Sequence, residues 1–222
     1  MYLVDLSALL DDAETVAQVI DETRRIWPDI YDAMDSEDTL WVFAPNIRRN
    51  GRYWPVAMAV ADAARNDTAL TLKNTITRYQ DPEPSGDLVN AYEEILFFVK
   101  DKRHYRFNKD EIRVTHVYEG KDWTEDRDSG QSAYHDTEVR RYNPNGKDPG
   151  NVWLEEIRDT TPDETVDETR PLSRTGVVMR CVLAGSEPDE TVHTYWVDES
   201  FEQAITEHGR ELHEVEQRGT FP

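Results

Sequence analysis

The chain has 222 residues, 37% of them hydrophobic, and its 46 acidic and 25 basic residues give a net charge of −21. This apolar content is enough for the core of one ordinary domain, so a disordered chain is excluded. The single Cys181 excludes an internal disulfide, and no apolar run approaches membrane-spanning length. Because the residues after Met1 lack a signal-peptide pattern, we expect a cytoplasmic protein with no membrane partner.

The acidic residues are spread along the whole chain, and only six of the basic residues are lysines. This pattern is typical of proteins adapted to a cytoplasm of molar salt, where screening shortens the reach of charge repulsion. The charge therefore indicates a halophilic habitat and is a poor guide to partners. In particular, it does not exclude nucleic acid.

In the first half of the chain, hydrophobic periodicity predicts alternating strands and helices. We expect strands at 2–4, 40–44 and 71–79, helices at 16–31 and 56–64, a loop at 45–53 and a turn at 81–86. Pro28 is expected to break the first long helix or to begin a new first turn. The continuous apolar run from Leu40 to Ala44 is typical of a buried parallel strand.

In the second half, the strongest strand signal is the run from Ile95 to Val99. We further expect strands at 190–197 and 212–215, helices at 177–184 and 201–208, and a long polar excursion at 115–140. Gly209 is expected to close the last helix. Strands that alternate with helices predict an α/β sheet with both faces covered.

The stretch from Arg141 to Trp153 holds two prolines and two glycines, which exclude a regular helix or a central strand. It is also basic at Arg140, Arg141 and Lys147 within a very acidic chain. Composition alone predicts a turn-rich surface connection. Its neighbours in the sequence allow a more specific interpretation.

Five segments, in the same order along the chain, resemble landmarks of the DNA amino-methyltransferases, which modify an exocyclic nitrogen of adenine or cytosine. The variant they resemble carries its catalytic motif before its cofactor motif. The segments are the strand at Leu40–Phe43, the strand at Leu72–Arg78, the Glu-x-Ile-Leu-x-x-x-Lys segment at Glu93–Lys100, the segment at Tyr105–Arg113, and the Asn-Pro-x-Gly-Lys-x-Pro-x-x-Val-Trp loop at Tyr142–Trp153. The resemblance implies a Rossmann-like S-adenosylmethionine-dependent methyltransferase fold. This would be a mostly parallel sheet flanked by helices in a single domain, 1–222, with an irregular polar insertion at about 115–150.

The chemistry of that family implies a site that holds a base flipped out of the duplex. A short Asp/Asn/Ser-Pro-Pro-aromatic turn at a strand end does this, because its oxygens accept from the target amino group and its ring stacks on the base. This sequence contains no Pro-Pro step, and at the expected place it has Asp5-Leu6-Ser7-Ala8, with neither prolines nor an aromatic ring. We therefore assign no catalytic residue.

The family's second implied site is a glycine-rich loop that lets the backbone approach S-adenosylmethionine. The corresponding stretch, Pro188 to Ser200, contains no glycine and places bulk and negative charge at Trp196, Val197 and Glu199. Glu216 matches the family acid that binds the cofactor ribose, although a solvated carboxylate is the simpler interpretation in so acidic a chain. We therefore expect no cofactor, or S-adenosylmethionine if the protein is an active enzyme.

Two basic stretches with interleaved aromatic residues are candidates for contacts with phosphates and bases. The candidate nucleic-acid-binding residues are Arg48, Arg49, Arg52, Tyr53, Lys102, Arg103, Arg106 and Lys147. The alternative is that these arginines cap sheet edges or pair with nearby carboxylates. The six histidines and the lone cysteine show no metal-binding or nucleophile signature.

Three hypotheses follow. The first is a catalytically impaired relative of the DNA amino-methyltransferases that binds DNA or pairs with an intact methyltransferase in a methylation or restriction-modification system, as a heterodimer or a homo-oligomer. The second is an active S-adenosylmethionine-dependent enzyme that uses Asp5 and a diverged cofactor loop. The third is a decayed remnant with no binding role.

Overall fold

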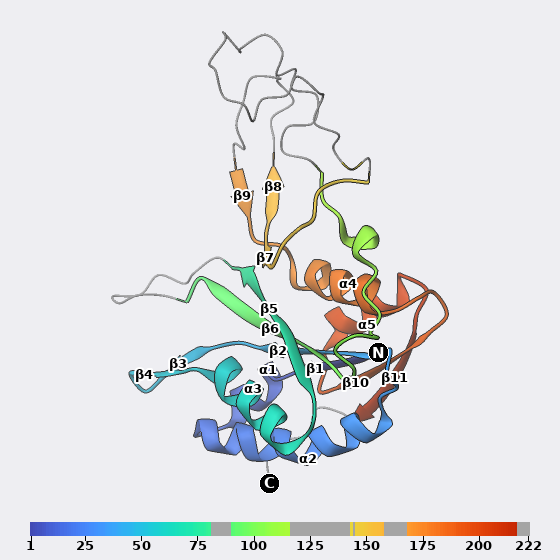
Figure 1. Ribbon diagram of the computed structural model, residues 1–222. Helices are drawn as coiled ribbons and strands as arrows, with labels where there is room; N and C mark the ends of the chain where they lie inside the picture. Colours follow the sequence, from blue (N-terminus) through green and yellow to red (C-terminus); the bar gives the residue numbers. More distant parts are fainter. Residues whose placement is uncertain (81–89, 116–142, 144, 158–167, 217–222) are drawn as a thin grey trace, which may run out of the picture.

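A seven-stranded sheet is the centre of the structure, a computed structural model that describes residues 1–80, 90–115, 143, 145–157 and 168–216 (Figure 1). The spatial order of the strands is β11-β10-β1-β2-β6-β5-β7. Their bounds are β1 Tyr2–Asp5, β2 Thr39–Ala44, β5 Thr71–Tyr79, β6 Tyr92–Val99, β7 Val152–Trp153, β10 Thr191–Tyr195 and β11 Glu211–Glu216. Two small antiparallel pairs lie outside this sheet, namely β3 Ile47–Arg49 with β4 Arg52–Trp54, and β8 Glu155–Ile157 with β9 Glu168–Arg170.

Most of the strand pairings in the sheet are parallel. β11, β10, β1 and β2 run in one direction, and β7 is parallel to β5. Only β6 runs antiparallel to its neighbours β2 and β5. The predicted mostly parallel α/β sheet is therefore confirmed.

Helices cover both faces of the sheet, as Figure 1 shows. The helices are α1 Ser7–Asp12, α2 Val16–Ala33, α3 Val56–Asp67, α4 Arg174–Gly185 and α5 Glu199–Thr206, and a short 3-10 helix, η1, spans Lys109–Ile112. Side chains of β2 alternate between the faces: Leu40 and Val42 pack with α2 and α3, whereas Trp41 and Phe43 pack with α4 and α5. Burial on both faces explains the continuous apolar run in this strand.

The predicted break at Pro28 is wrong, because α2 continues through this residue to Ala33. A proline removes one helical hydrogen bond and frees the carbonyl four residues earlier. Here Pro28 and Arg24 both lie on the exposed side of the helix, where water can satisfy that carbonyl. The buried residues Ile26 and Ile30 on either side of Pro28 keep the helix against the core.

The loop predicted at 45–53 contains a β-hairpin instead, formed by β3 and β4. Its turn residues Asn50 and Gly51 have φ angles of 52° and 71°. Positive φ at both positions is the requirement of the tight hairpin turn that Asn-Gly favours. The prediction was wrong because this dipeptide signal was not weighed.

The predicted irregular loop before Trp153 is confirmed for its described part, residues 143 and 145–151. Lys147 pairs with Val114 through two backbone hydrogen bonds, and Gly146 and Gly150 adopt positive φ angles of 103° and 69°. Trp153 ends the segment in the core at 2% exposure. The predicted turn at 81–86 and residues 116–140 of the predicted excursion lie outside the described residues.

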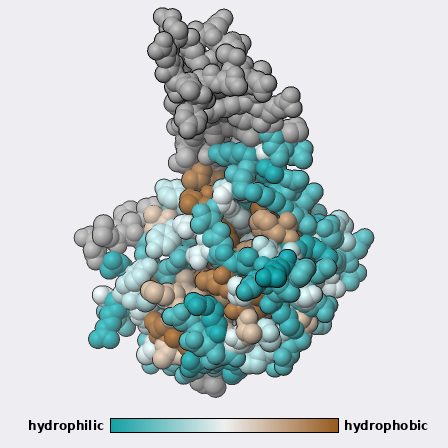
Figure 2. Space-filling view, viewed as in Figure 1, coloured by the Kyte–Doolittle hydropathy of each residue, from teal (hydrophilic) through white to brown (hydrophobic). Residues whose placement is uncertain are grey.

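The face drawn in Figure 2 is mostly hydrophilic, with hydrophobic residues visible at its centre. Among the residues that the structure describes, no helix combines the length and the apolar character needed to cross a membrane.

Candidate functional site

The carboxyl ends of four parallel strands meet at one edge of the sheet. At this edge β1 ends at Asp5, β10 at Tyr195 and β11 at Glu216. Antiparallel β6 begins there, which brings Glu93 to the same edge. Open α/β sheets bind ligands in the crevice outside this edge. It is therefore the candidate functional site.

The guanidinium of Arg174, at the start of α4, occupies this edge. Its Nη2 lies 2.7 Å from Oδ1 of Asp5 and donates to Oγ of Ser7 at 3.0 Å, while its Nη1 lies 3.3 Å from Oε1 of Glu93. Its Nε, 3.9 Å from Asp198, makes no hydrogen bond to a described residue. Burial lowers the pKa of Arg174, but the carboxylates of Asp5 and Glu93 outweigh this effect and raise the pKa above its ordinary value. The group is thus a permanent cation surrounded by three carboxylates.

A second arginine extends the same ion-pair network. Arg78 on β5 lies 2.9 Å from Oε2 of Glu93 and donates from Nε to the carbonyl of Leu172 at 3.0 Å. Asp5 and Glu93 are only 2% and 1% exposed. A ligand therefore reaches neither carboxylate unless Arg174 is displaced.

Aromatic rings form the apolar wall of this cluster. The carbon at the centre of the Arg174 guanidinium lies 5.7 Å from the ring centroid of Phe43 and 5.3 Å from that of Phe201. Both rings are fully buried and meet edge to face. A guanidinium is favoured over such rings because it is planar and weakly hydrated.

The chain after β10 is compact and is occupied by large side chains. Trp196 has a φ of 57°, in the left-handed region that favours glycine, and is 3% exposed. Val197 is 7% exposed. The side chain of Asp198 accepts from the backbone N–H of Ser200 at 2.9 Å and so caps α5. The segment after β10 thus has a backbone conformation typical of glycine at Trp196, but the large side chains of Trp196 and Val197 occupy the space beside it.

The turn after β1 passes directly into a helix. Oδ1 of Asp5 accepts from the backbone N–H of Ser7 at 3.0 Å, and Leu6 is fully buried. Helix α1 starts at Ser7. The expected place of a stacking ring is thus taken by a buried aliphatic side chain and a helix start.

Metal and thiol chemistry find no support in the described part of the chain. There, no group of three His, Cys, Asp or Glu side chains is placed to hold a metal ion. Complete burial raises the pKa of the Cys181 thiol well above its ordinary value, which disfavours the reactive thiolate.

The first predicted basic stretch forms the β3–β4 hairpin. Arg48 and Arg52 are exposed, and Arg48 lies 5.9 Å from the ring centroid of Tyr53, which is 42% exposed. Burial and a hydrogen bond with Tyr92 raise the pKa of Tyr53 to about 12. Arg49 differs, because its guanidinium donates to backbone carbonyls near the end of α1, among them that of Leu10 at 2.7 Å.

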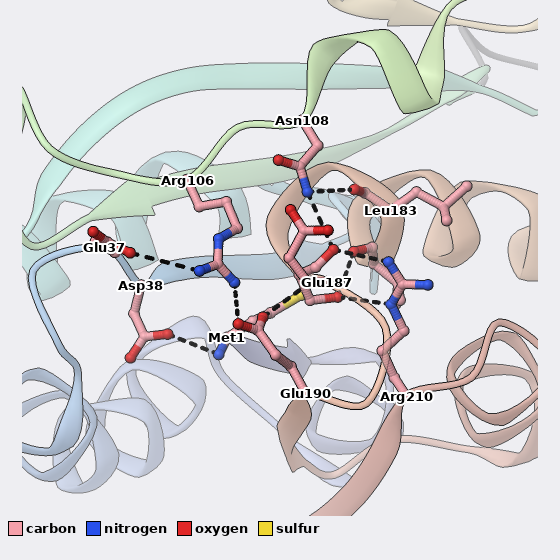
Figure 3. Close-up of polar contacts among 11 residues, drawn as sticks. Met1, Glu37, Asp38, Arg106, Asn108, Leu183, Glu187, Glu190 and Arg210 are labelled. Atoms are coloured by element: carbon pink, nitrogen blue, oxygen red, sulfur yellow. Dashed lines mark hydrogen bonds and ion pairs between the residues drawn. The ribbon is translucent and has the colours of Figure 1, made fainter.

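The second predicted basic stretch lies at the other end of β2, about 20 Å away at the usual rise per strand residue. Lys102 and Arg103 are exposed there. Arg106 is held between Glu190 and Glu37, beside Asp38 and the amino terminus, as Figure 3 shows. The two stretches therefore form separate patches.

Two remaining predicted residues lie in different places. Lys147 makes the backbone bridge with Val114 in the irregular loop. Glu216 ends β11 and pairs with Tyr195, which puts its backbone at the candidate site.

The central residue of the site, Arg174, was missed by the sequence analysis. A usable signal was present in Glu93, a carboxylate two residues before the apolar run from Ile95 to Val99. Such a residue requires a cationic partner. The sequence alone does not say which arginine supplies it.

A mostly parallel seven-stranded sheet with a candidate site at its carboxyl edge defines a Rossmann-like methyltransferase architecture. The family model for DNA methylase matches residues 5–194. The chain therefore belongs to the DNA methylase family, as its resemblance predicted. No curated protein matches its sequence.

Solved structures of DNA methyltransferases share the fold. The cytosine-N4-specific PvuII DNA methyltransferase has a TM-score of 0.62 at 7% identity over 97% of this chain and 73% of its own. A candidate DNA modification methylase from Thermus thermophilus has a TM-score of 0.58 at 14% identity over 97% and 78%. M1.HpyAVI, in complex with S-adenosylmethionine, has a TM-score of 0.50 at 11% identity over 97% and 79%.

Proposed function

We propose that this protein is a catalytically impaired member of the DNA methylase family that binds DNA or acts as a partner subunit of a methylation or restriction-modification system. The observation that carries this proposal is the Arg174 guanidinium, which occupies the carboxyl edge of the sheet between Asp5 and Asp198.

The residues at this edge do not fit S-adenosylmethionine as they are arranged. The cofactor carries a cationic sulfonium and a cationic amino group, and the buried carboxylates at this edge, Asp5 and Glu93, are already paired with Arg174. The bend after β10 presents Trp196 and Val197, both buried, instead of a bare backbone.

The residues after β1 do not fit a flipped base either. Recognition of such a base requires stacking and acceptors for its amino group. Leu6 is buried and aliphatic, and the Asp5 carboxylate is already bound by Arg174 and by the backbone of Ser7.

DNA contact is supported by the exposed cations of the hairpin, Arg48 and Arg52, next to the exposed ring of Tyr53. Lys102 and Arg103 offer a second patch. Local positive charge is scarce in a chain of net charge −21, so such patches set where a phosphate backbone can approach. A paired methyltransferase would supply the missing chemistry.

An active enzyme is the second candidate. Asp5 at the end of β1 and Glu216 at the end of β11 keep acidic residues at the edge where that family needs them. This candidate requires Arg174 to leave the edge when the cofactor binds.

Calorimetric titration of S-adenosylmethionine in molar KCl separates the two. We expect no binding tighter than about 1 mM, a threshold that corresponds to roughly 4 kcal/mol of binding free energy. Micromolar binding at one site per chain would establish the enzyme instead.

Anisotropy with labelled duplex DNA tests the DNA role. Arg48→Ala/Arg52→Ala should weaken binding and reduce its salt dependence, whereas Arg65→Ala, on the exposed face of α3, should not. Equal binding by both variants would leave partner pairing as the role.

A further inference from the structure

A pocket of about 170 Å³ lies on the α4 side of the sheet, and its lining includes none of Asp5, Glu93 and Arg174. It is bordered by the amino end of β5, the segment after β6 and the loop before β7. Five of its described lining residues are aromatic, namely Trp41, Phe97, Tyr105, Phe107 and Trp153.

Buried aromatic rings form the bottom of the pocket, and the exposed ring of Phe107 lies at its edge. Trp41 stacks on Phe97 with centroids 4.3 Å apart and planes 15° apart. Phe107 lies nearly parallel to Trp41, at 6.5 Å and 23°. Trp41, Phe97 and Trp153 are at most 5% exposed, whereas Phe107 is 39% exposed. A planar ligand would cover the exposed ring and gain offset stacking.

The charged groups of the lining favour an anion. Lys73 is the extra residue of a β-bulge between Leu72 and Asn74, and bulges redirect side chains. Its Nζ lies 4.7 Å from the Tyr105 ring centroid, and the residue as a whole is exposed. Asp148, the only carboxylate among the described lining residues, is paired with Lys109, and this hydrogen bond lowers its pKa. Among those residues the charge of Lys73 therefore has no carboxylate of its own, which disfavours a cationic ligand of the kind that aromatic cages bind.

The lysines around the pocket strengthen its preference for an anionic ligand. Of the six lysines in the chain, Lys73, Lys102, Lys109 and Lys147 lie in the segments that line or adjoin the pocket. The Lys73 ammonium donates to the carbonyl of Lys102 at 3.3 Å, which brings these segments together. This concentration is unusual in a chain where most cations are arginine.

We propose that this pocket binds a nucleotide whose base is a single ring, with the base stacked against Phe107 and the phosphate at Lys73. A cavity of about 150 Å³ holds a benzene molecule, so the volume of this pocket matches one six-membered ring rather than a purine. Aromatic side chains stack on any base, and a lysine at the mouth follows the phosphate. The nucleotide is either free or part of a single strand. The proposal does not depend on the impaired edge, so it can fail or succeed independently of the proposed function.

Tryptophan fluorescence and calorimetry with thymidine 5′-monophosphate test the proposal. The wild-type protein should bind this nucleotide more tightly than thymidine. Phe107→Ala should weaken binding at least five-fold, because base stacking is worth about 1–3 kcal/mol. Lys73→Met should remove the preference for the monophosphate over thymidine. Met58→Ala, which changes an exposed apolar side chain on α3, should bind as the wild type does.

Circular dichroism must first show that each variant is folded, so that a loss of binding reports the missing side chain. Displacement of a twelve-residue thymidine oligonucleotide by the monophosphate would identify a nucleotide within a strand. Binding of the monophosphate without such displacement would identify the free nucleotide. The proposal is overturned if the wild type does not bind the monophosphate, if Phe107→Ala binds equally well, if Lys73→Met keeps the preference for the monophosphate, or if tetramethylammonium binds in its place.

Discussion

Replacement of Arg174 by methionine should destabilise the protein by about 3 kcal/mol. At an effective dielectric constant of about 20, the 2.7 Å contact with Asp5 is worth roughly 6 kcal/mol before desolvation is counted. Removing one partner of a buried pair typically costs about 3–5 kcal/mol, because the other charge stays buried. Glu93 keeps Arg78 at 2.9 Å, so the lower end of this range applies.

Urea unfolding at constant molar KCl measures this loss, and the midpoint should fall without a change in slope. Arg65→Met is the matched control, since this arginine is 55% exposed and pairs with Asp62 at 3.6 Å. Its cost should stay within about 0.5 kcal/mol. The double variant Asp5→Asn/Arg174→Met should be more stable than the sum of the single changes predicts, by at least about 1 kcal/mol. A cost for Arg174→Met no larger than that of the control, or strict additivity, would refute the reasoning.

Four further predictions follow from the charge, a histidine and the packing. Raising KCl from about 0.1 M to 2 M should raise the melting temperature by several degrees, because the salt screens the repulsion within a net charge of −21, and a melting temperature unchanged by salt would contradict this. Burial and the Met1 ammonium lower the pKa of His193 below 6.5 in the folded protein, so the unfolded chain binds the proton more readily. Stability should therefore fall as the pH drops below about 6.5. In urea unfolding, His193→Gln should make this decline shallower. Trp153→Ala should cost about 3–5 kcal/mol in the same assay, because the ring is 2% exposed. Gly146→Ala should cost more than about 1 kcal/mol, because φ is 103° and a Cβ would lie 2.5 Å from the carbonyl oxygen of Val114.

The central strands could be predicted because a strand buried on both faces has a continuous run of apolar residues in the sequence. The run from Ile95 to Val99 is almost fully buried in β6, and Leu40 to Ala44 packs on both faces in β2. The errors at Pro28 and at the 45–53 segment have different causes. The helix-breaking signal of Pro28 is outweighed because this residue lies on the exposed side of α2. The 45–53 segment carries the Asn50-Gly51 hairpin signal, which a loop prediction ignores.

The ion-pair network could not be predicted in the same way, because it depends on contacts between distant parts of the chain. Arg174 meets Asp5, Glu93 and Asp198 only once the sheet order places β1, β6 and β10 at one edge. Arg106 was singled out as a nucleic-acid contact, yet its pairing with Glu190 across 84 positions already uses its guanidinium. Sequence patterns identify charged residues but not their partners.

The charges at the carboxyl edge of the sheet are balanced by residues of the chain itself. Asp5 and Glu93 stay buried at the ends of β1 and β6, and buried carboxylates require a positive charge nearby. The guanidinium of Arg174 meets this requirement from within the chain, so the edge is electrostatically complete with no ligand. If a cofactor had to supply that charge, stability would depend on its concentration by mass action. We therefore expect the melting temperature of the wild-type protein to be insensitive to S-adenosylmethionine at millimolar concentration. A shift of several degrees would show that the ligand competes with Arg174 for the edge.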